Sequence, residues 1–227
     1  MFKLISKKQY SERVFCLEIE APLIARSCKA GNFIIIRVDK NSERVPYTIA
    51  MSDADKGTLT LVVQEVGLSS TKLCRLEPGA YIEDVVGPLG TPSKIENYGT
   101  VLCAGGGIGI AAILPILTAL KKAGNRVVSV LAGRTKELVI MVAQYSDEVI
   151  IMTDDGSWGE KGVVTAGMEK VIKREHVDKV LAIGPPIMMK FCSLMAQKYN
   201  IPNDVSLNTI MVDGTGMCGA CRLTIGG

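Results

Sequence analysis

From residue 100 onward, this chain of 227 residues alternates short apolar runs with longer stretches of helical periodicity. This feature constrains the fold most, because strands that alternate with helices form a parallel sheet with helices on its faces. We expect strands at 100–104, 127–132, 148–153 and 180–183, each followed by a helix, at 110–123, 136–144, 164–175 and 186–198. The second half of the chain is therefore predicted to be an α/β domain.

The first half of the chain has a different pattern, with short β-branched or aromatic runs bounded by Gly, Asp and Asn. We expect strands within 31–38, 45–52, 57–66 and 83–90, and one helix at 69–76. Short strands at this density are typical of a small antiparallel barrel. We divide the chain into a barrel domain at 1–97, an α/β domain at 98–204, and a tail rich in Gly and Cys at 205–227.

Composition excludes several classes of protein. Hydrophobic residues make up 48% of the chain and charged residues 22%, which is enough for a well-buried core. The net charge of +3 comes from 26 basic and 23 acidic residues that are mixed along the chain, so we expect no nucleic-acid partner. The opening Met1-Phe2-Lys3-Leu4 has no signal-peptide pattern.

The cysteines indicate a reducing, cytoplasmic setting. Seven is an odd number for a disulfide framework. We expect five of them to be small buried apolar residues, namely Cys16, Cys28, Cys74, Cys103 and Cys192.

One uncharged segment, 101–120, is long enough to span a bilayer. Three consecutive glycines and Pro115 make it a poor uninterrupted helix. A strand, a glycine turn and a buried helix that begins near Ala111 or Ala112 explain the same residues, with Pro115 in the first turn. We therefore favour a buried strand and helix over a membrane span.

The glycine run of this segment follows the predicted strand and precedes the helix. Glycines at such a place let the backbone approach a pyrophosphate, whose charge the helix N-terminus offsets. The run departs from G-x-G-x-x-G, because Ile110 holds the last glycine position. Gly133-Arg134 also stands where an acidic residue would bind a ribose. A tight strand–helix turn without a ligand remains the alternative.

Two segments of the first half could bind an anion or a ring. Arg44 offers a forked donor to a phosphate, and Tyr47 offers a flat face to a flavin. The segment 67–71 begins the predicted helix with small hydroxyl residues, which suits a second anion site. Taken alone, the first segment is better explained as an ordinary strand with an exposed Arg, and the second as the cap that any helix needs.

The tail contains Asp213-x4-Cys218-x2-Cys221. This spacing matches the first three ligands of the plant-type [2Fe–2S] pattern, with Asp in the first place. A cluster needs a fourth ligand, and the sequence stops six residues after Cys221. A flexible tail with two ordinary thiols explains the same residues. A redox-active Cys-x-x-Cys pair fits the same spacing equally well.

Other residues point to no chemistry. His176 is the only histidine, which excludes a site with several His ligands and makes a Ser-His-Asp triad improbable. We expect His176 to be exposed, Trp158 to cover a loop, and Met188 and Met189 to lie in the core.

Taken in order, these segments resemble the ferredoxin–NADP⁺ reductase superfamily along essentially the whole chain. The similarity is greater to its subunit-type members. These are the electron-transfer subunit of dihydroorotate dehydrogenase and the small (alpha) subunit of NADH-dependent reduced ferredoxin:NADP⁺ oxidoreductase. The second is nearer, on RVPYTIA, LTLVVQEVG and especially NTIMVDGTGMCGACRLTIGG.

The resemblance implies an FAD-binding barrel, an NAD(P)-binding α/β domain and the start of a [2Fe–2S]-binding tail. Because the family's final cysteine would lie beyond residue 227, we expect this tail either to be truncated or to lack its cluster. It implies that FAD is held by Arg44, Tyr47, Thr48, Ile49, Gly67, Ser70 and Thr71. The nicotinamide nucleotide would be held by Gly105, Gly106, Gly107, Gly109, Gly184 and Pro185, and the cluster by Asp213, Cys218 and Cys221. The residue type of Arg134 would suit a 2′-phosphate of NADP, whereas the resemblance favours NAD(H). We assign no catalytic side chain, since the cofactors carry the chemistry.

The implied function is hydride transfer between NAD(P)H and FAD. Single electrons would then pass to or from a [2Fe–2S] cluster and a larger flavoprotein or Fe–S catalytic subunit. Two alternatives are the electron-transfer subunit of dihydroorotate dehydrogenase and a non-catalytic, redox-sensing nucleotide-binding module.

Overall fold

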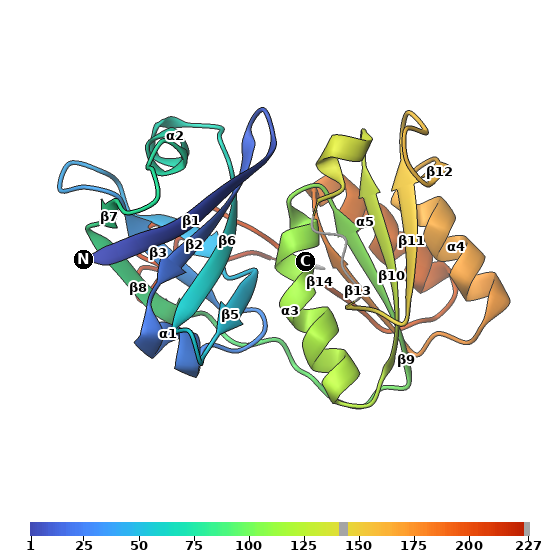
Figure 1. The fold of residues 1–227 in the computed structure, drawn as a ribbon. Coiled ribbons are helices and arrows are strands. Elements are labelled where there is room, and N and C mark those ends of the chain that lie inside the picture. Colours follow the sequence, from blue (N-terminus) through green and yellow to red (C-terminus); the bar gives the residue numbers. More distant parts are fainter. Residues whose placement is uncertain (141–144, 225–227) are drawn as a thin grey trace. The chain divides into compact units, whose positions relative to one another are not determined.

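The structure is a computed structural model that describes residues 1–140 and 145–224. The chain forms two compact units (Figure 1). One comprises Met1–Ser93 with the tail from Asn208, and the other comprises Lys94–Leu207. These units divide the chain after Ser93 and after Leu207. The domain boundaries that we predicted at residues 97 and 204 remain predictions.

The first unit is built from two antiparallel sheets. A five-stranded sheet has the order β5-β6-β2-β1-β7, and a three-stranded sheet has the order β4-β3-β8. Its elements are β1 (Phe2–Ser11), β2 (Val14–Glu20), α1 (Pro22–Ser27), β3 (Phe33–Arg37), β4 (Val45–Thr48), β5 (Met51–Asp53), β6 (Thr58–Gln64), α2 (Leu68–Cys74), β7 (Tyr81–Ile82) and β8 (Asp84–Leu89). Fully buried side chains from both sheets, such as Leu17, Ile34 and Leu61, form one core. The predicted antiparallel barrel is confirmed.

The predicted strand 45–52 is in fact two strands that belong to different sheets. β4 pairs with β3, and β5 pairs with β6. Between them the backbone N–H of Ile49 donates to the Asn32 carbonyl, and that of Ala50 donates to the Thr60 carbonyl. Both side chains are buried at this crossing, so the segment joins the two sheets.

The second unit contains a six-stranded parallel sheet in the order β12-β11-β10-β9-β13-β14. The predicted parallel sheet is confirmed. Its strands are β9 (Thr100–Gly106), β10 (Arg126–Gly133), β11 (Glu148–Thr153), β12 (Glu160–Lys161), β13 (Lys179–Ile183) and β14 (Asn203–Val205), and its helices are η1 (Lys136–Leu138), α3 (Gly109–Lys122), α4 (Val164–Arg174) and α5 (Pro186–Lys198). α4 and α5 share a buried cluster with one face of the sheet, and α3 covers the opposite face (Figure 1). Of the helix predicted at 136–144, the described part is the single turn η1, and residues 141–144 lie outside the described residues.

The uncharged segment 101–120 divides into β9, a glycine turn and most of α3, all largely buried. No helix within the described residues is long and apolar enough to cross a membrane. α3 begins at Gly109, so the expected start near Ala111 was wrong and Pro115 lies inside the helix. Proline has no N–H, so the carbonyl four residues earlier loses its usual helical partner.

Candidate functional site

β4 presents the first predicted FAD residues in three different ways. Tyr47 pairs with Ile34 of β3 and packs against the buried core. Its hydroxyl is buried and has no hydrogen-bond partner among the described residues. Burial raises the pKa of Tyr47 to about 12, and the nearby Cys74 adds to the rise. Thr48 is exposed, whereas the Ile49 side chain belongs to the core, so only its backbone is available to a ligand.

Arg44 lies just before β4 with a side chain that is 56% exposed. One of its guanidinium nitrogens lies 3.5 Å from the Asp84 carboxylate. Arg37 binds the same oxygen at 2.6 Å, so Asp84 is shared by two cations. A carboxylate that is already paired closely with Arg37 holds Arg44 only loosely, which leaves the Arg44 guanidinium available to an anion.

The loop before α2 is shaped by Ser70. The hydroxyl of Ser70 accepts the N–H groups of Val66 and Gly67, each at 3.0 Å, and donates to the Gly67 carbonyl. These bonds occupy the hydroxyl, so Ser70 orients the loop and offers a ligand only its backbone N–H. Ser69 donates to the Glu43 carboxylate at 3.2 Å, which ties the first turn of α2 to the residue before Arg44.

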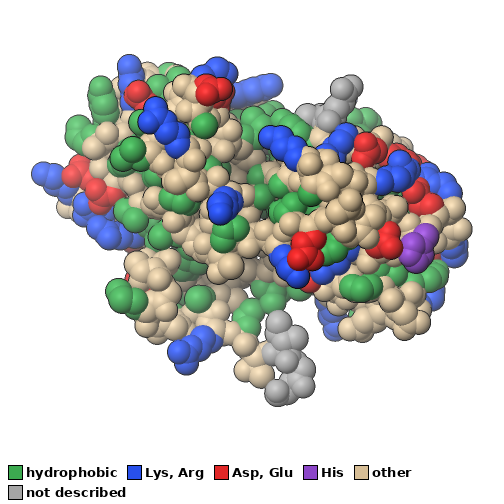
Figure 2. Space-filling model, turned by 90° about the horizontal axis from the view of Figure 1, so that it is seen from below, with side chains coloured by type: hydrophobic (Ala, Val, Ile, Leu, Met, Phe, Trp, Pro, Cys, Tyr) green, Lys and Arg blue, Asp and Glu red, His purple; other side chains and the backbone are tan. Residues whose placement is uncertain are grey.

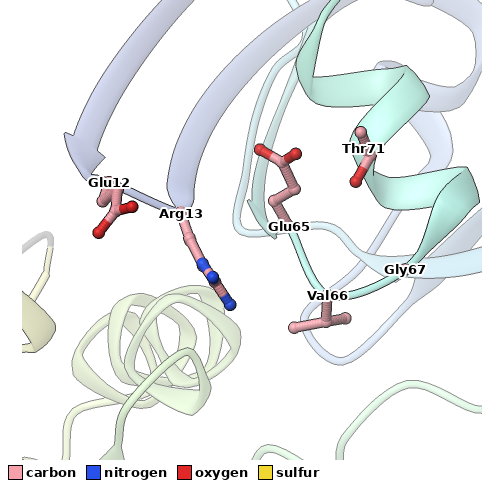
Figure 3. A pocket seen from close by; sticks show the side chains of 6 residues that line it. All are labelled: Glu12, Arg13, Glu65, Val66, Gly67 and Thr71. Atoms are coloured by element: carbon pink, nitrogen blue, oxygen red, sulfur yellow. The ribbon is translucent and has the colours of Figure 1, made fainter.

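Gly67 and Thr71 line a pocket in the first unit (Figure 3). Its other lining residues are Glu12, Arg13, Glu65 and Val66. Glu12 and Arg13 project from the turn between β1 and β2, opposite the end of β6 and the start of α2. Sequence reasoning missed Arg13 and Glu65, because they lie about fifty residues apart and neither belongs to a motif.

The predicted nucleotide residues meet where the order of the parallel strands reverses. From β9 the chain continues to β10 on one side, while β13 lies on the other side. Gly105 pairs with Ile183, so the glycine run and Gly184-Pro185 lie together at the carboxyl ends of β9 and β13. Open α/β sheets bind their ligands in this crevice outside the carboxyl ends of the strands.

Close packing explains why glycines occupy this edge. A Cβ added at Gly109 would lie 2.5 Å from the Ile183 carbonyl oxygen and 2.8 Å from the Gly184 Cα. One added at Gly106 would collide with the Met188 sulfur. Gly107 has φ +55°, a left-handed conformation that favours glycine, and a Cβ there would meet nothing within 4 Å. The turn therefore brings α3 against β13 and leaves open space beside Gly107.

Arg134 follows β10 at the same end of the sheet and is exposed. Its carbonyl accepts the N–H of Asp155 at 3.3 Å, which joins the loops after β10 and β11. The Ser157 hydroxyl accepts the N–H of Lys136 at 2.8 Å and reinforces this junction. Within the part of the chain that the structure describes, the Arg134 side chain forms no ion pair.

The three predicted cluster ligands lie in one loop of the tail. The Asp213 carboxylate accepts the N–H groups of Thr215 at 2.8 Å and Cys218 at 3.2 Å, which lowers the pKa of Asp213. The N–H of Ala220 points to the Cys218 sulfur at 3.5 Å. Cys218 and Cys221 are free and exposed. Yet no group of three His, Cys, Asp or Glu side chains among residues 1–140 and 145–224 converges on a metal position.

Other residues behave mostly as expected. The His176 side chain is 86% exposed and lies 3.1 Å from Asp178. Cys74, Cys103 and Cys192 are buried as predicted, whereas Cys16 and Cys28 are only half-buried. Met189 is buried in the core. Lys and Arg side chains lie among Asp and Glu side chains on the face in Figure 2, without a broad basic patch.

Comparisons with known proteins add to this geometry. Residues 1–93 match the oxidoreductase FAD-binding domain family. A Thermotoga maritima protein named dihydroorotate dehydrogenase B (NAD(+)), electron transfer subunit homolog, is 47% identical over 99% of this chain and 80% of its own length. The Desulforamulus reducens electron transfer subunit of dihydroorotate dehydrogenase B is 31% identical, over 98% and 87%. The chain belongs to this family of electron-transfer subunits.

The fold agrees with this assignment. A chain in the solved structure of the NADH-dependent reduced ferredoxin-NADP oxidoreductase, described with flavin-based electron bifurcation, superposes with a TM-score of 0.92. It is 46% identical and is matched over 98% of this subunit and 81% of its own length. The resemblance seen in the sequence is thus confirmed, and the subunit is an FAD-binding oxidoreductase.

Proposed function

We propose that the subunit transfers hydride between NAD(P)H and FAD and exchanges single electrons with a partner subunit through a [2Fe–2S] cluster. Two separate sets of residues support the proposal. In the first unit, Arg44, Tyr47 and the loop before α2 offer an exposed guanidinium, a buried hydroxyl without a partner among the described residues, and backbone N–H groups. In the second unit, a glycine turn lies where the strand order reverses.

The residues of the first unit fit FAD. The buried Tyr47 hydroxyl lacks a hydrogen-bond partner among the described residues, which suits a site completed by a ligand. Arg44 and the first backbone N–H groups of α2 would meet the pyrophosphate, and Ser70 would fix the loop that presents them. Thr48 and the Ile49 backbone would orient the ring system.

The residues of the second unit fit a nicotinamide nucleotide. The close packing at Gly106 and Gly109 lets the backbone reach a pyrophosphate, and Gly107 keeps the space beside it open. Gly105 would hold the end of β9 in place, Gly184-Pro185 would border the nicotinamide half, and Arg134 would lie near the adenosine ribose. When bound, the two cofactors supply hydride transfer, and the protein supplies their orientation and electrostatic surroundings.

The tail fits an iron–sulfur cluster in its chemistry but not in its arrangement. Two exposed thiols and a carboxylate share a loop in which a backbone N–H already points to a sulfur. The three side chains do not converge among the described residues, so we derive no step through the cluster. Asp213, Cys218 and Cys221 remain the proposed ligands.

We propose a larger flavoprotein or Fe–S catalytic subunit as the partner. The relatives named above are electron-transfer subunits, which by their names act with another subunit. The names also support the second candidate function, electron transfer for dihydroorotate dehydrogenase. Seven free cysteines favour a cytoplasmic location.

The proposed function is tested by NAD(P)H oxidation with ferricyanide as the electron acceptor. The purified subunit reconstituted with FAD should reduce ferricyanide with NADH or NADPH as donor, and the apoprotein should not. Gly106→Val should abolish this reaction, because the valine side chain would collide with Met188 in the second unit. FAD binding should persist, because the substitution lies outside the first unit. An FAD-loaded subunit that oxidises neither nucleotide would refute the proposal.

A further inference from the structure

α5 presents a row of apolar side chains to solvent, here called the α5 stripe. It is formed by Ile187, Phe191 and Leu194, which are 62%, 52% and 47% exposed. Positions i, i+4 and i+7 lie on one face of a helix. The opposite face, which includes Met189 and Cys192, belongs to the buried cluster of the second unit. A helix that is apolar on both faces is typical of an element covered on both sides.

α4 shows how the outer face of a helix in the same layer ordinarily looks. The two helices share one buried cluster on one face of the sheet (Figure 1). Apart from Ala166, the exposed residues of α4 are charged, namely Lys170, Lys173 and Arg174. Single exposed apolar residues are common on protein surfaces, whereas a contiguous group marks a surface that binds another molecule. The α5 stripe is such a group.

The charge beside the α5 stripe is positive. Lys190 lies three residues after Ile187 and four before Leu194, so it is the neighbour of both on the helix surface. Lys190 is exposed, and in the described part of the chain its ammonium group forms no ion pair or hydrogen bond. α5 contains no Asp or Glu. The stripe therefore complements a surface that is apolar and carries a carboxylate.

A second copy of this chain fits the α5 stripe poorly. A two-fold contact meets itself at its centre, and the centre of the stripe lies at Lys190 and Phe191. Such a pair would bring Lys190 toward the same lysine of the other copy, with no carboxylate from α5 to separate the two. Like charges that face each other across an interface cost free energy.

An anionic lipid surface fits the stripe poorly as well. Helices that lie on membranes carry many Lys or Arg side chains on their polar face. α5 has only Lys190 and Lys198, and Lys198 lies 3.3 Å from the Glu169 carboxylate. Among the residues that the structure describes, Lys190 is thus the one unpaired cation of this helix.

We propose that the α5 stripe is a docking surface for the partner subunit. The occupant is an apolar surface segment of that subunit with a carboxylate that faces Lys190. This inference rests on the proposed partner subunit and adds the surface that binds it. Phe191 is the central anchor, since aromatic side chains often dominate the binding energy of an interface. Lys190 selects an acidic partner.

Acetylation of lysines tests the surface in the native complex. The subunit is tagged, isolated together with its partner from the cells that produce both, and treated with an N-hydroxysuccinimide ester of acetate. Mass spectrometry should show that Lys190 reacts severalfold more slowly in the complex than in the isolated subunit. Lys173 on α4, which is 65% exposed, is the control and should react equally in both. Equal reactivity of Lys190 in both, or a wild-type subunit isolated without a partner, would overturn the inference.

Titration of the subunit with the purified partner measures the contribution of single side chains. Phe191→Ser and Lys190→Glu should each raise the dissociation constant roughly tenfold or more. Lys190→Arg keeps the charge and should retain the affinity. Lys170→Glu, the same charge reversal on the outer face of α4, is the matched control and should bind as wild type does. Unchanged affinity in both Phe191→Ser and Lys190→Glu would overturn the inference.

The isolated, FAD-loaded variants separate docking from folding and from the proposed function. Phe191→Ser and Lys190→Glu should keep the melting temperature and the ferricyanide activity close to those of wild type, because both side chains are exposed. A large fall in the melting temperature of Phe191→Ser would show that the stripe is covered within this chain, and would overturn the inference. A wild-type subunit without ferricyanide activity would refute the proposed function but leave the partner titration readable.

Vesicles of equal parts phosphatidylglycerol and phosphatidylcholine test the lipid alternative. The wild-type subunit should remain in solution when these vesicles are sedimented. Sedimentation with the vesicles that is lost in Lys190→Glu would assign the α5 stripe to a lipid surface, and would overturn the inference.

Discussion

At the scale of single residues, the proposed FAD site includes side chains that their neighbours hold incompletely. Arg44 lies 3.5 Å from an Asp84 oxygen that Arg37 already binds at 2.6 Å. Tyr47 has a buried hydroxyl without a partner among the described residues. Both features leave hydrogen-bonding capacity at β4 that a bound flavin nucleotide can use.

Arg44→Ala should weaken FAD binding by roughly ten- to a hundredfold, because a charge-assisted, forked contact to the pyrophosphate is lost. Flavin retained after gel filtration, with a titration of the apoprotein, measures the effect. Arg26→Ala, an exposed Arg on α1, is the control and should retain full flavin content. Equal retention by both variants would remove Arg44 from the site.

Tyr47 should make the stability of the first unit depend on alkaline pH. Its folded pKa is raised to about 12 from an ordinary value of 10.0, so the folded state keeps a proton that the unfolded state loses. Stability is therefore full below pH 10 and falls as the pH rises toward 12, by up to about 2 kcal/mol. Urea unfolding of wild type and Tyr47→Phe at pH 8 and pH 11 measures this, and a parallel decline in both would contradict it.

At the scale of elements, the proposed nucleotide site depends on how closely α3 approaches β13. The Gly109 Cα lies so near the end of β13 that an added Cβ would be 2.5 Å from the Ile183 carbonyl oxygen. Backbone atoms cannot move aside as a flexible side chain can. A side chain at this position must therefore shift the start of α3, and with it the glycine turn that follows β9.

Gly109→Ala should raise the KM for NADH at least tenfold in the ferricyanide assay, since the turn no longer fits a pyrophosphate. FAD content should be unchanged, because the substitution lies in the other unit. Gly79→Ala is a useful control: φ there is +95°, but no atom lies within 4 Å of an added Cβ. It tests backbone strain without a collision, and a KM increase of the same size in both variants would contradict the packing argument.

The elements differ in how well their sequence predicts them. The bounds of β11 and α5 agree with prediction, because a continuous apolar strand and a helix begun by Pro186 have strong local signals. β1 and β2 were not predicted. β1 is largely exposed and contains three lysines, so its strand character depends on pairing with β2 and β7. The six-residue α1 was also missed, being too short to show helical periodicity.

The site residues were predictable where they form motifs and not where only the fold unites them. The glycine run and Gly184 could be found in the sequence, but their meeting depends on the strand order, which places β13 beside β9. Arg13 and Glu65 gave no signal, because only the pairing of β2 with β6 brings them together. The hydroxyl of Ser70 is used within its own loop, so its predicted contact with the pyrophosphate falls to its backbone N–H and stays a prediction.

At the scale of the whole molecule, the chain forms two compact units, one antiparallel and one parallel, and the proposed cofactor sites are divided between them. The tail from Asn208 belongs to the first unit, where Gly214 packs against Ile35 of β3. The proposed cluster ligands thus lie on the unit that matches the FAD-binding domain family, rather than on the unit proposed to bind the nicotinamide nucleotide. This arrangement suits electron exchange between flavin and cluster, and identity to relatives extends over nearly the entire chain.

The most direct test of the central claim is the visible absorption spectrum of the subunit, recorded anaerobically before and after addition of NADH or NADPH. The account predicts the two bands of an oxidised flavin, which bleach when one equivalent of the preferred nucleotide is added. A colourless protein that takes up no added FAD, or a flavin that neither nucleotide reduces, would contradict it.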